Sequence, residues 1–173
     1  PIFKDRVAMV IGSGNSALNS VIDLLPFASK IYVLTHGDAM RGDAVLQEEI
    51  KNNPKVEIIF NATVSGLEGD LMIKAIKYKD GVSQEEKRLE VFGAFVNIGM
   101  KPNSELVKDL VQLNENGEIV TDFLGRTSQF GIWAAGDITS LPYKQISIAI
   151  GDGIRAALDV YAEVKKTKNK DAI

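Results

Sequence analysis

Cysteine is absent from this sequence, histidine and tryptophan each occur once, and there is no long apolar run. The lack of cysteine excludes disulfides, thiolate zinc sites and a dithiol redox pair within the 173 residues. A net charge of −3 excludes the broad positive field that nucleic-acid binding needs. No run reaches the roughly 18 apolar residues of a membrane span, and residues 1–11 lack a signal-peptide pattern. We therefore expect a cytoplasmic protein with no nucleic-acid and no membrane partner.

The sequence has the composition of a folded globular protein, and the order of its elements predicts an α/β domain. Apolar residues make up 45% of the chain and charged residues 25%, as in ordinary globular proteins. A buried apolar run, an amphipathic stretch ended by Pro26 and a second apolar run predict a Rossmann-like βαβ unit. The elements expected up to residue 60 are a strand at 7–11, a helix at 15–25, a strand at 30–34, a helix at 44–51 and a strand at 56–60.

The pattern changes after residue 61. Alternating segments joined by short turns, among them Asp80-Gly81, predict an antiparallel meander with strands at 63–67, 71–79 and 88–96. Beyond residue 100 we expect a short helix at 104–110, strands at 118–121 and 132–135, and a long helix at 146–166. Ile150, Ile154, Ala157, Leu158 and Tyr161 share one side of that helix.

A glycine-rich turn follows the first expected strand and opens the first helix. It has the G-x-G-x-x-A spacing of dinucleotide-binding turns. The first glycine permits the tight turn, the second lets the backbone approach a pyrophosphate, and the alanine permits close packing of helix and strand. The free amide groups of the helix then face the anion. The alternative is a glycine turn kept for packing alone. The expected cofactor-binding residues are Gly12, Ser13, Gly14, Asn15, Ser16 and Ala17.

The end of the second strand is where a dinucleotide-binding domain recognises the adenosine ribose. An acid there accepts from both ribose hydroxyls and repels a 2′-phosphate, and Asp38 stands close by. Arg41 is the first arginine of this loop, so the charges favour NADH over NADPH. A solvated turn is the alternative role for Asp38. We expect Thr35, His36, Asp38 and Arg41 to line this pocket, with His36 as a wall and not as a general base.

A second candidate site follows the expected strand at 132–135. Gly136 and Asp137 stand at its carboxyl end, where ligands of α/β sheets bind, and an aspartate there can accept from a polyol hydroxyl. Lys144, Gln145 and Ile146 then open the long helix, whose amino end can face a phosphate or an electron-rich ring. The simpler alternative is a strand-turn-helix unit in which Asp137 caps the helix and binds no ligand.

Four ordered motifs give these segments a family resemblance. Residues 96–103 read Val-Asn-Ile-Gly-Met-Lys-Pro-Asn, and residues 131–137, 142–146 and 151–153 follow in the same order. Together they resemble the thioredoxin reductase family, among the class-II pyridine nucleotide-disulfide oxidoreductases. The resemblance is strongest to the branch that holds the alkyl hydroperoxide reductase flavoprotein subunit and its NADH-dependent relatives.

The resemblance implies two parts of one flavoprotein. Residues 1–92 would be the NAD(P)-binding domain and residues 93–173 the carboxyl-terminal portion of the FAD-binding domain. Asp137 matches the aspartate that binds the flavin's ribityl chain, and the segment 144–146 matches the one beside the isoalloxazine ring. The resemblance adds Ile98 and Gly99 to the expected cofactor-binding residues.

Two departures from the family limit this transfer. NADPH-using relatives carry His-Arg-Arg where this chain has His36-Gly37-Asp38, and the NADH-using branch has a glutamate at the position of Thr35. The family's redox cysteine pair lies before the segment that matches Pro1, and the amino-terminal FAD half also precedes it. We therefore expect the sequence to be a piece of a longer protein.

The resemblance implies a parent enzyme that passes hydride from NADH, or NADPH, to FAD and then electrons to a disulfide. A thioredoxin-like or peroxiredoxin-type protein would be its redox partner, and the parent would be a homodimer. No catalytic acid or base and no metal ligand is expected in this chain, which would bind the nicotinamide cofactor without turnover. The alternatives are a cysteine-free enzyme like the ferredoxin–NADP reductases, and a stand-alone NADH-binding or sensor module.

Overall fold

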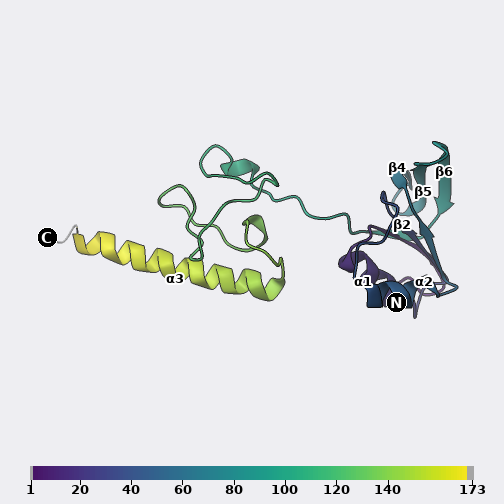
Figure 1. Ribbon diagram of the computed structural model, residues 1–173, viewed down its shortest axis with the longest axis horizontal. Coiled ribbons are helices and arrows are strands. Elements are labelled where there is room, and N and C mark those ends of the chain that lie inside the picture. The colour runs from purple at the N-terminus through teal and green to yellow at the C-terminus, as the bar shows by residue number, and fades with distance from the viewer. Residues whose placement is uncertain (1, 171–173) are drawn as a thin grey trace. The chain divides into compact units, whose positions relative to one another are not determined.

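The computed structural model describes residues 2–170, and the chain divides after Gly99 into two compact units (Figure 1). We call residues up to Gly99 the first unit and residues from Met100 onward the second unit. The expected domain boundary lay after residue 92. The compact division falls later because strand β7, Gly93–Val96, pairs with a strand of the first unit.

A parallel sheet organises the first unit, with strand order β3-β2-β1-β7. The predicted βαβ unit is confirmed, and its first helix ends at Leu24, shortly before Pro26. Helix α2 begins and ends where the sequence predicts. The bounds are β1 Val7–Ile11, α1 Asn15–Leu24, β2 Lys30–Leu34, α2 Ala44–Lys51 and β3 Val56–Ile59.

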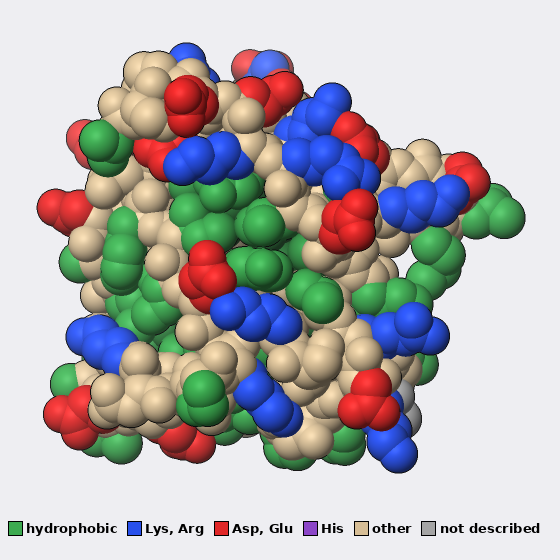
Figure 2. Space-filling view, turned by 90° about the vertical axis from the view of Figure 1, so that its right-hand side faces the viewer, with side chains coloured by type: hydrophobic (Ala, Val, Ile, Leu, Met, Phe, Trp, Pro, Cys, Tyr) green, Lys and Arg blue, Asp and Glu red, His purple; other side chains and the backbone are tan. Residues whose placement is uncertain are grey.

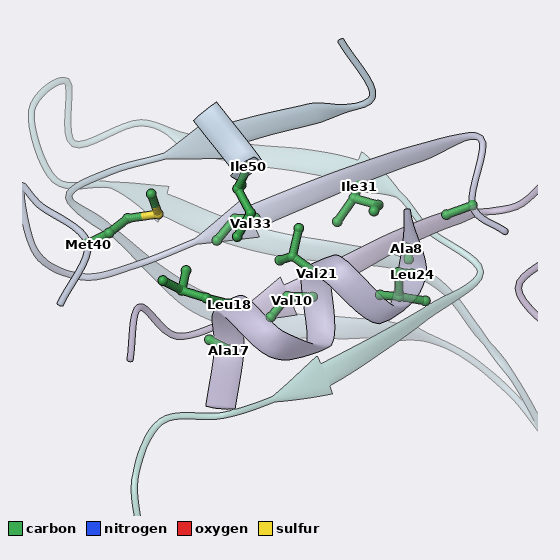
Figure 3. Packing of buried hydrophobic residues seen from close by; sticks show 11 residues of the cluster. Ala8, Val10, Ala17, Leu18, Val21, Leu24, Ile31, Val33, Met40 and Ile50 are labelled. Carbon is green, nitrogen blue, oxygen red and sulfur yellow. The ribbon is translucent and has the colours of Figure 1, made fainter. Parts of the chain in front are cut away.

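The central strand β1 contributes to two hydrophobic cores because its side chains alternate between the two faces of the sheet. Ala8 and Val10 belong to a cluster with buried residues of α1 and α2, which Figure 3 shows packed between helix and strands. Met9 and Ile11 belong to a second cluster with residues of the antiparallel strands. The first unit is therefore built in three layers: helices, parallel sheet and antiparallel sheet.

The antiparallel layer is the predicted meander, with order β4-β5-β6. The expected single strand at 88–96 was wrong. It is two strands in different sheets, because the amide of Val91 donates to Lys74 of β5 and the amide of Phe92 donates to Val7 of β1. The chain changes its pairing partner between these two residues. The bounds are β4 Ala62–Gly69, β5 Ile73–Asp80 and β6 Glu86–Glu90.

Charged side chains on the outer strands pair with one another. Glu68 of β4 accepts from Lys77 at 3.0 Å and from Arg88 at 2.7 Å. On the face drawn in Figure 2, basic and acidic side chains are interspersed around a group of apolar ones, so that face carries no extended area of one sign.

The second unit has little regular structure before its long helix α3, Ile146–Lys170. The helix expected at 104–110 is a single 3₁₀ turn, η1, Glu105–Val107. The strands expected at 118–121 and 132–135 are wrong, because among the described residues Ile119 and Trp133 make only isolated bridges. Ile119 bridges Leu113 and Thr139, and Trp133 bridges Arg126, but none of these bridges extends into a ladder. A second 3₁₀ turn, η2, is Gly136–Ile138. Within residues 2–170, no helix is both long and apolar enough to cross a membrane.

Helix α3 is buried on its acidic side. Asp159 accepts from Arg126 at 2.6 and 2.7 Å and from the Trp133 indole at 2.8 Å. Asp152 is buried and pairs with Arg155 at 2.9 Å. The apolar side expected from the sequence is exposed instead, over Ile150, Ile154, Ala157, Leu158 and Tyr161.

Candidate functional site

The turn from β1 into α1 is closed by Gly12. Its φ of +135° lies in the region that favours glycine. A Cβ built on Gly12 would stand 2.1 Å from the carbonyl oxygen of Asn97 and 3.3 Å from the Cβ of Ala17. Gly12 is therefore required by the fold itself, since the end of β7 and helix α1 both approach it closely. The 3.3 Å between this position and the Ala17 Cβ is the close packing of helix and strand that the sequence predicts for Ala17.

Gly14 is different, because neither its backbone conformation nor the packing of the described residues requires a glycine there. It is the N-cap of α1, with φ −83° and ψ 178°, which any residue adopts. Apart from its chain neighbours, a Cβ on Gly14 would meet no atom of residues 2–170 within 4 Å. No side chain caps the helix and no acid lies in its first turn. The amide groups at the start of α1 thus face an open position with the positive end of the helix dipole behind them. This position fits a bound anion such as a pyrophosphate.

The remaining residues of the turn fasten it to the loop after β2. The carbonyl of Ser13 accepts from the amides of Arg41 and Gly42 at 2.8 and 2.9 Å. The side-chain oxygen of Asn15 accepts from the amide of Asp43 at 2.7 Å. Ser16 is exposed, and its carbonyl accepts from the Ser20 hydroxyl. Sequence reasoning placed these residues at the phosphate but did not foresee their link to the loop.

A cavity of about 320 Å³ opens at the carboxyl ends of β1 and β2. It brings together four of the predicted residues, Gly12, Thr35, His36 and Ile98. The carboxyl edge of a parallel sheet is where ligands of such folds bind. The cavity is lined by Ile11, Gly12, Leu34, Thr35, His36, Ala62, Thr63, Val64 and Ile98.

The two charged residues predicted for the ribose pocket stand outside this cavity. Asp38 and Arg41 are exposed on the loop between β2 and α2. Thr35 is buried, and its hydroxyl accepts from the amide of Gly37 at 3.3 Å. A threonine here shapes the turn and carries no charge.

The residues predicted for the flavin lie in the second unit. Asp137 is exposed in η2, beside Gly136, whose φ is +76°. Gln145 and Ile146 are exposed at the start of α3. Gly99, at the end of the first unit, has φ +106°, and a Cβ there would meet no atom within 4 Å among the described residues beyond its chain neighbours.

Lys144 points into its own unit. Its ammonium donates to the carbonyls of Thr139 and Leu141 and pairs with Glu118 at 3.1 Å. Hydrogen bonds from Asn114 and Lys144 lower the pKa of the Glu118 carboxyl below its usual value. Three acceptors match the three donors of an ammonium group. The Lys144 side chain therefore holds the loop before α3 and has no donor left for a ligand.

Several residues at the first-unit site were missed by sequence reasoning. Asn97 closes the glycine turn with its carbonyl, and its side chain donates to Ser20 at 3.0 Å. Gln47 of α2 donates to the carbonyls of Met40 and Gly42. Asn61 donates its amide to Gly37 at 2.9 Å. The spacing of Gln47 from the turn gave no signal, whereas an asparagine beside a strand end is a known turn former.

Comparison with known proteins gives close relatives for nearly the whole chain. It is 42% identical over 168 residues to the F subunit of an alkyl hydroperoxide reductase of Pseudomonas aeruginosa, covering 96% of this chain and 32% of that protein. It is 38% identical over 161 residues to an NADH dehydrogenase of Bacillus subtilis, covering 93% of this chain and 32% of that protein. The chain thus spans about a third of the length of these curated relatives.

Solved structures agree with the sequence comparison. A thioredoxin reductase of Lactococcus lactis is 30% identical with a TM-score of 0.79, covering 95% of this chain and 55% of that one. A thioredoxin reductase of T. acidophilum is 35% identical with a TM-score of 0.76, covering 94% and 54%. Residues 3–153 match the family model described as pyridine nucleotide-disulphide oxidoreductase. The predicted resemblance is confirmed: the chain belongs to the pyridine nucleotide-disulphide oxidoreductase family.

Proposed function

We propose that the chain is the pyridine-nucleotide-binding part of a thioredoxin-reductase-like flavoenzyme, together with the carboxyl-terminal portion of its flavin domain. The first unit would bind NADH, and the second unit would contribute Asp137 and the exposed start of α3 to FAD. The whole protein would pass hydride from NADH to FAD and electrons on to a disulfide. The names of the relatives, which include an alkyl hydroperoxide reductase and thioredoxin reductases, support a peroxiredoxin-type or thioredoxin-like partner. We also propose a cytoplasmic homodimer for the whole protein.

The open position at Gly14 carries this proposal. The fold requires a glycine at position 12, but neither backbone conformation nor packing requires one at position 14. A pyrophosphate lying on the first amides of α1 would explain the glycine at position 14, because a Cβ there would occupy the space that the pyrophosphate needs. The bound nicotinamide supplies the hydride, while this chain's residues hold and orient it.

The cavity at the strand ends supports the same reading. It lies beside Gly12 and is lined largely by apolar side chains, with Thr35 and Thr63 as hydroxyl-bearing ones. Such a cavity would exclude water from a ring of the bound nucleotide, and it offers few hydrogen-bonding groups to orient that ring. The B. subtilis relative, an NADH dehydrogenase, and the acidic Asp38 on the adjacent loop both favour NADH.

Calorimetric titration of the chain with NADH tests the proposal. We expect saturable binding that Gly14→Val abolishes, because valine fits the extended backbone but fills the anion position. Gly66→Val is the matched control, since a Cβ there meets only ordinary contacts with Lys77 at 3.9 and 4.0 Å. It should bind NADH as the unmodified chain does.

The chain alone should oxidise no NADH, because a flavin half is needed to take up the hydride. Absence of NADH binding, or equal binding by Gly14→Val, contradicts the nucleotide assignment. Purified chain that carries stoichiometric flavin and oxidises NADH contradicts the assignment of this chain as an inactive part.

A further inference from the structure

We propose that Asn15, Asp43 and Gln47 form a latch that fixes the loop after β2 to the phosphate-binding turn and thereby sets the choice between NADH and NADPH. The proposal rests on nucleotide binding at the first unit. These three are positioning residues, because they act through the loop and need no contact with the adenosine. The loop in question is residues 37–43.

The first part of the latch is a reciprocal pair between α1 and the start of α2. Asn15 accepts from the amide of Asp43 at 2.7 Å and donates to the Asp43 carboxylate at 3.2 Å. Asp43 occupies the N-cap of α2 but makes no side-chain cap there. An aspartate at an N-cap ordinarily accepts from the first amides of its own helix. Here the carboxylate is turned to the phosphate-binding turn instead.

Gln47 supplies the second part. Its side-chain amide donates to the carbonyls of Met40 and Gly42 at 3.2 and 2.7 Å. The amides of Arg41 and Gly42 are held on the Ser13 carbonyl at the same time. Gly42 lies so close to α1 that a Cβ would stand 2.3 Å from a Leu18 methyl. Residues 40–43 are therefore fastened through both backbone donors and backbone acceptors.

The other end of the loop is fastened separately. The carbonyl of Gly37 accepts from the amide of Asn61 at 2.9 Å, and Asn61 adopts a φ of +52°. Asp38 and Ala39 lie between the two fastenings, and both are exposed. The loop thus presents a tip of two residues whose direction is set by bonds on either side.

The tip carries the Asp38 carboxylate, whose charge would distinguish NADH from NADPH. A carboxylate held at the ribose accepts from its hydroxyls and repels a 2′-phosphate. A tip free to move loses both effects, because the acid is no longer held in place. Arg41 stands on the same loop, so freeing the loop also lets this cation reach a phosphate. Loosening the latch should therefore weaken NADH binding more than NADPH binding.

Gln47→Met tests the latch in the whole chain, with the dissociation constants of NADH and NADPH measured by calorimetry. Methionine keeps the length and neutrality of glutamine but donates nothing. We expect the dissociation constant of NADH to rise about 5- to 20-fold, which corresponds to the loss of one to two hydrogen bonds. The preference of the chain for NADH over NADPH should shrink at least about threefold. Val45→Met introduces the same residue at an exposed site of α2 and should change neither value.

A pair of changes at Asp43 separates the latch from charge. Asp43→Asn and Asp43→Ala remove the same charge, but only asparagine can still accept from Asn15. We expect Asp43→Asn to keep the NADH preference and Asp43→Ala to lose part of it. Equal preference in the two variants, or an unchanged preference in Gln47→Met, overturns the latch. If the unmodified chain binds no NADH, it is the proposed function that fails.

Discussion

Strand β1 and helix α3 show how differently the two units bury apolar side chains. Four of the five side chains of β1 are buried, and they supply two separate cores. Helix α3 is much longer, yet it buries an acid and a small alanine, and its isoleucines and leucine are exposed. Among the described residues of the second unit, the buried apolar side chains are Val111, Ile119 and Ala156.

This difference indicates that the first unit contains its own core and that the second is held by polar contacts. Apolar burial is the dominant favourable contribution to folding, and specific ion pairs contribute far less. An exposed apolar helix face of this size is typical of a surface that another segment covers. It supports the proposal that the second unit is one portion of a flavin domain.

The largest effect should come from a backbone position where packing is tightest. Gly12→Ala places a Cβ against the Asn97 carbonyl and forces a strained φ, so we expect a loss of roughly 3 to 5 kcal/mol in the unfolding free energy. In the second unit, Gly131 has a φ of +87°, and a Cβ there would meet no atom of the described residues within 4 Å beyond its chain neighbours. Gly131→Ala is therefore the comparison variant. It should cost only about 1 to 2 kcal/mol. Urea unfolding followed by circular dichroism measures both, and equal losses would remove the contrast in packing.

A leucine pair tests the same contrast for side chains. Leu18 is fully buried, whereas Leu158 is 65% exposed. Leu18→Ala should lower the unfolding free energy by about 2 to 5 kcal/mol, and Leu158→Ala should change it by less than about 0.5 kcal/mol. A large loss at Leu158, measured by the same urea experiment, would mean that the apolar side of α3 is already covered in the isolated chain.

The smallest expected effect is a pH dependence confined to the second unit. Hydrogen bonds from Arg126 and the Trp133 indole hold the pKa of Asp159 at about 2, below its usual value of 3.8. A carboxyl with a lowered pKa stabilises the fold fully above about pH 4, and that stability is lost as the pH falls towards 2. Trp133, the single tryptophan, should report this loss by fluorescence.

Asp159→Asn should flatten that fluorescence change. Asp80 is the matched control in the first unit, since bonds from Lys87 and two backbone amides also hold its pKa at about 2. Asp80→Asn should leave the Trp133 signal unchanged. A fluorescence change that persists in Asp159→Asn would assign the acid transition to other carboxyls.

The sequence predicted the first unit well because its signals are local. Apolar runs between breakers place β1, α1, β2 and α2 to within a residue, and the spacing from Gly12 to Ala17 identifies the turn between them. Pairing is not local, which is why the switch at Val91 and Phe92 was missed. No pattern within residues 88–96 distinguishes one long strand from two strands in different sheets.

The second unit shows the opposite limit. Residues 132–135 have the composition of a buried strand, but a strand needs a neighbour along several residues. In the described part of the chain, Trp133 makes a single isolated bridge, to Arg126. Lys144 was expected beside a ring because of its position in a motif. Its side chain turns inward because Glu118 and two carbonyls provide acceptors from distant or irregular segments, which a linear pattern does not reveal.

The acid contacts of α3 also determine how the helix is turned about its axis. Apolar burial is non-directional, so by itself it fixes the rotation of a helix less strictly than hydrogen bonds do. The bidentate contact of Arg126 with Asp159, together with the bond from the Trp133 indole, favours one rotation of the helix about its axis. The exposed isoleucines and the leucine of α3 therefore keep one orientation before any other surface contacts them.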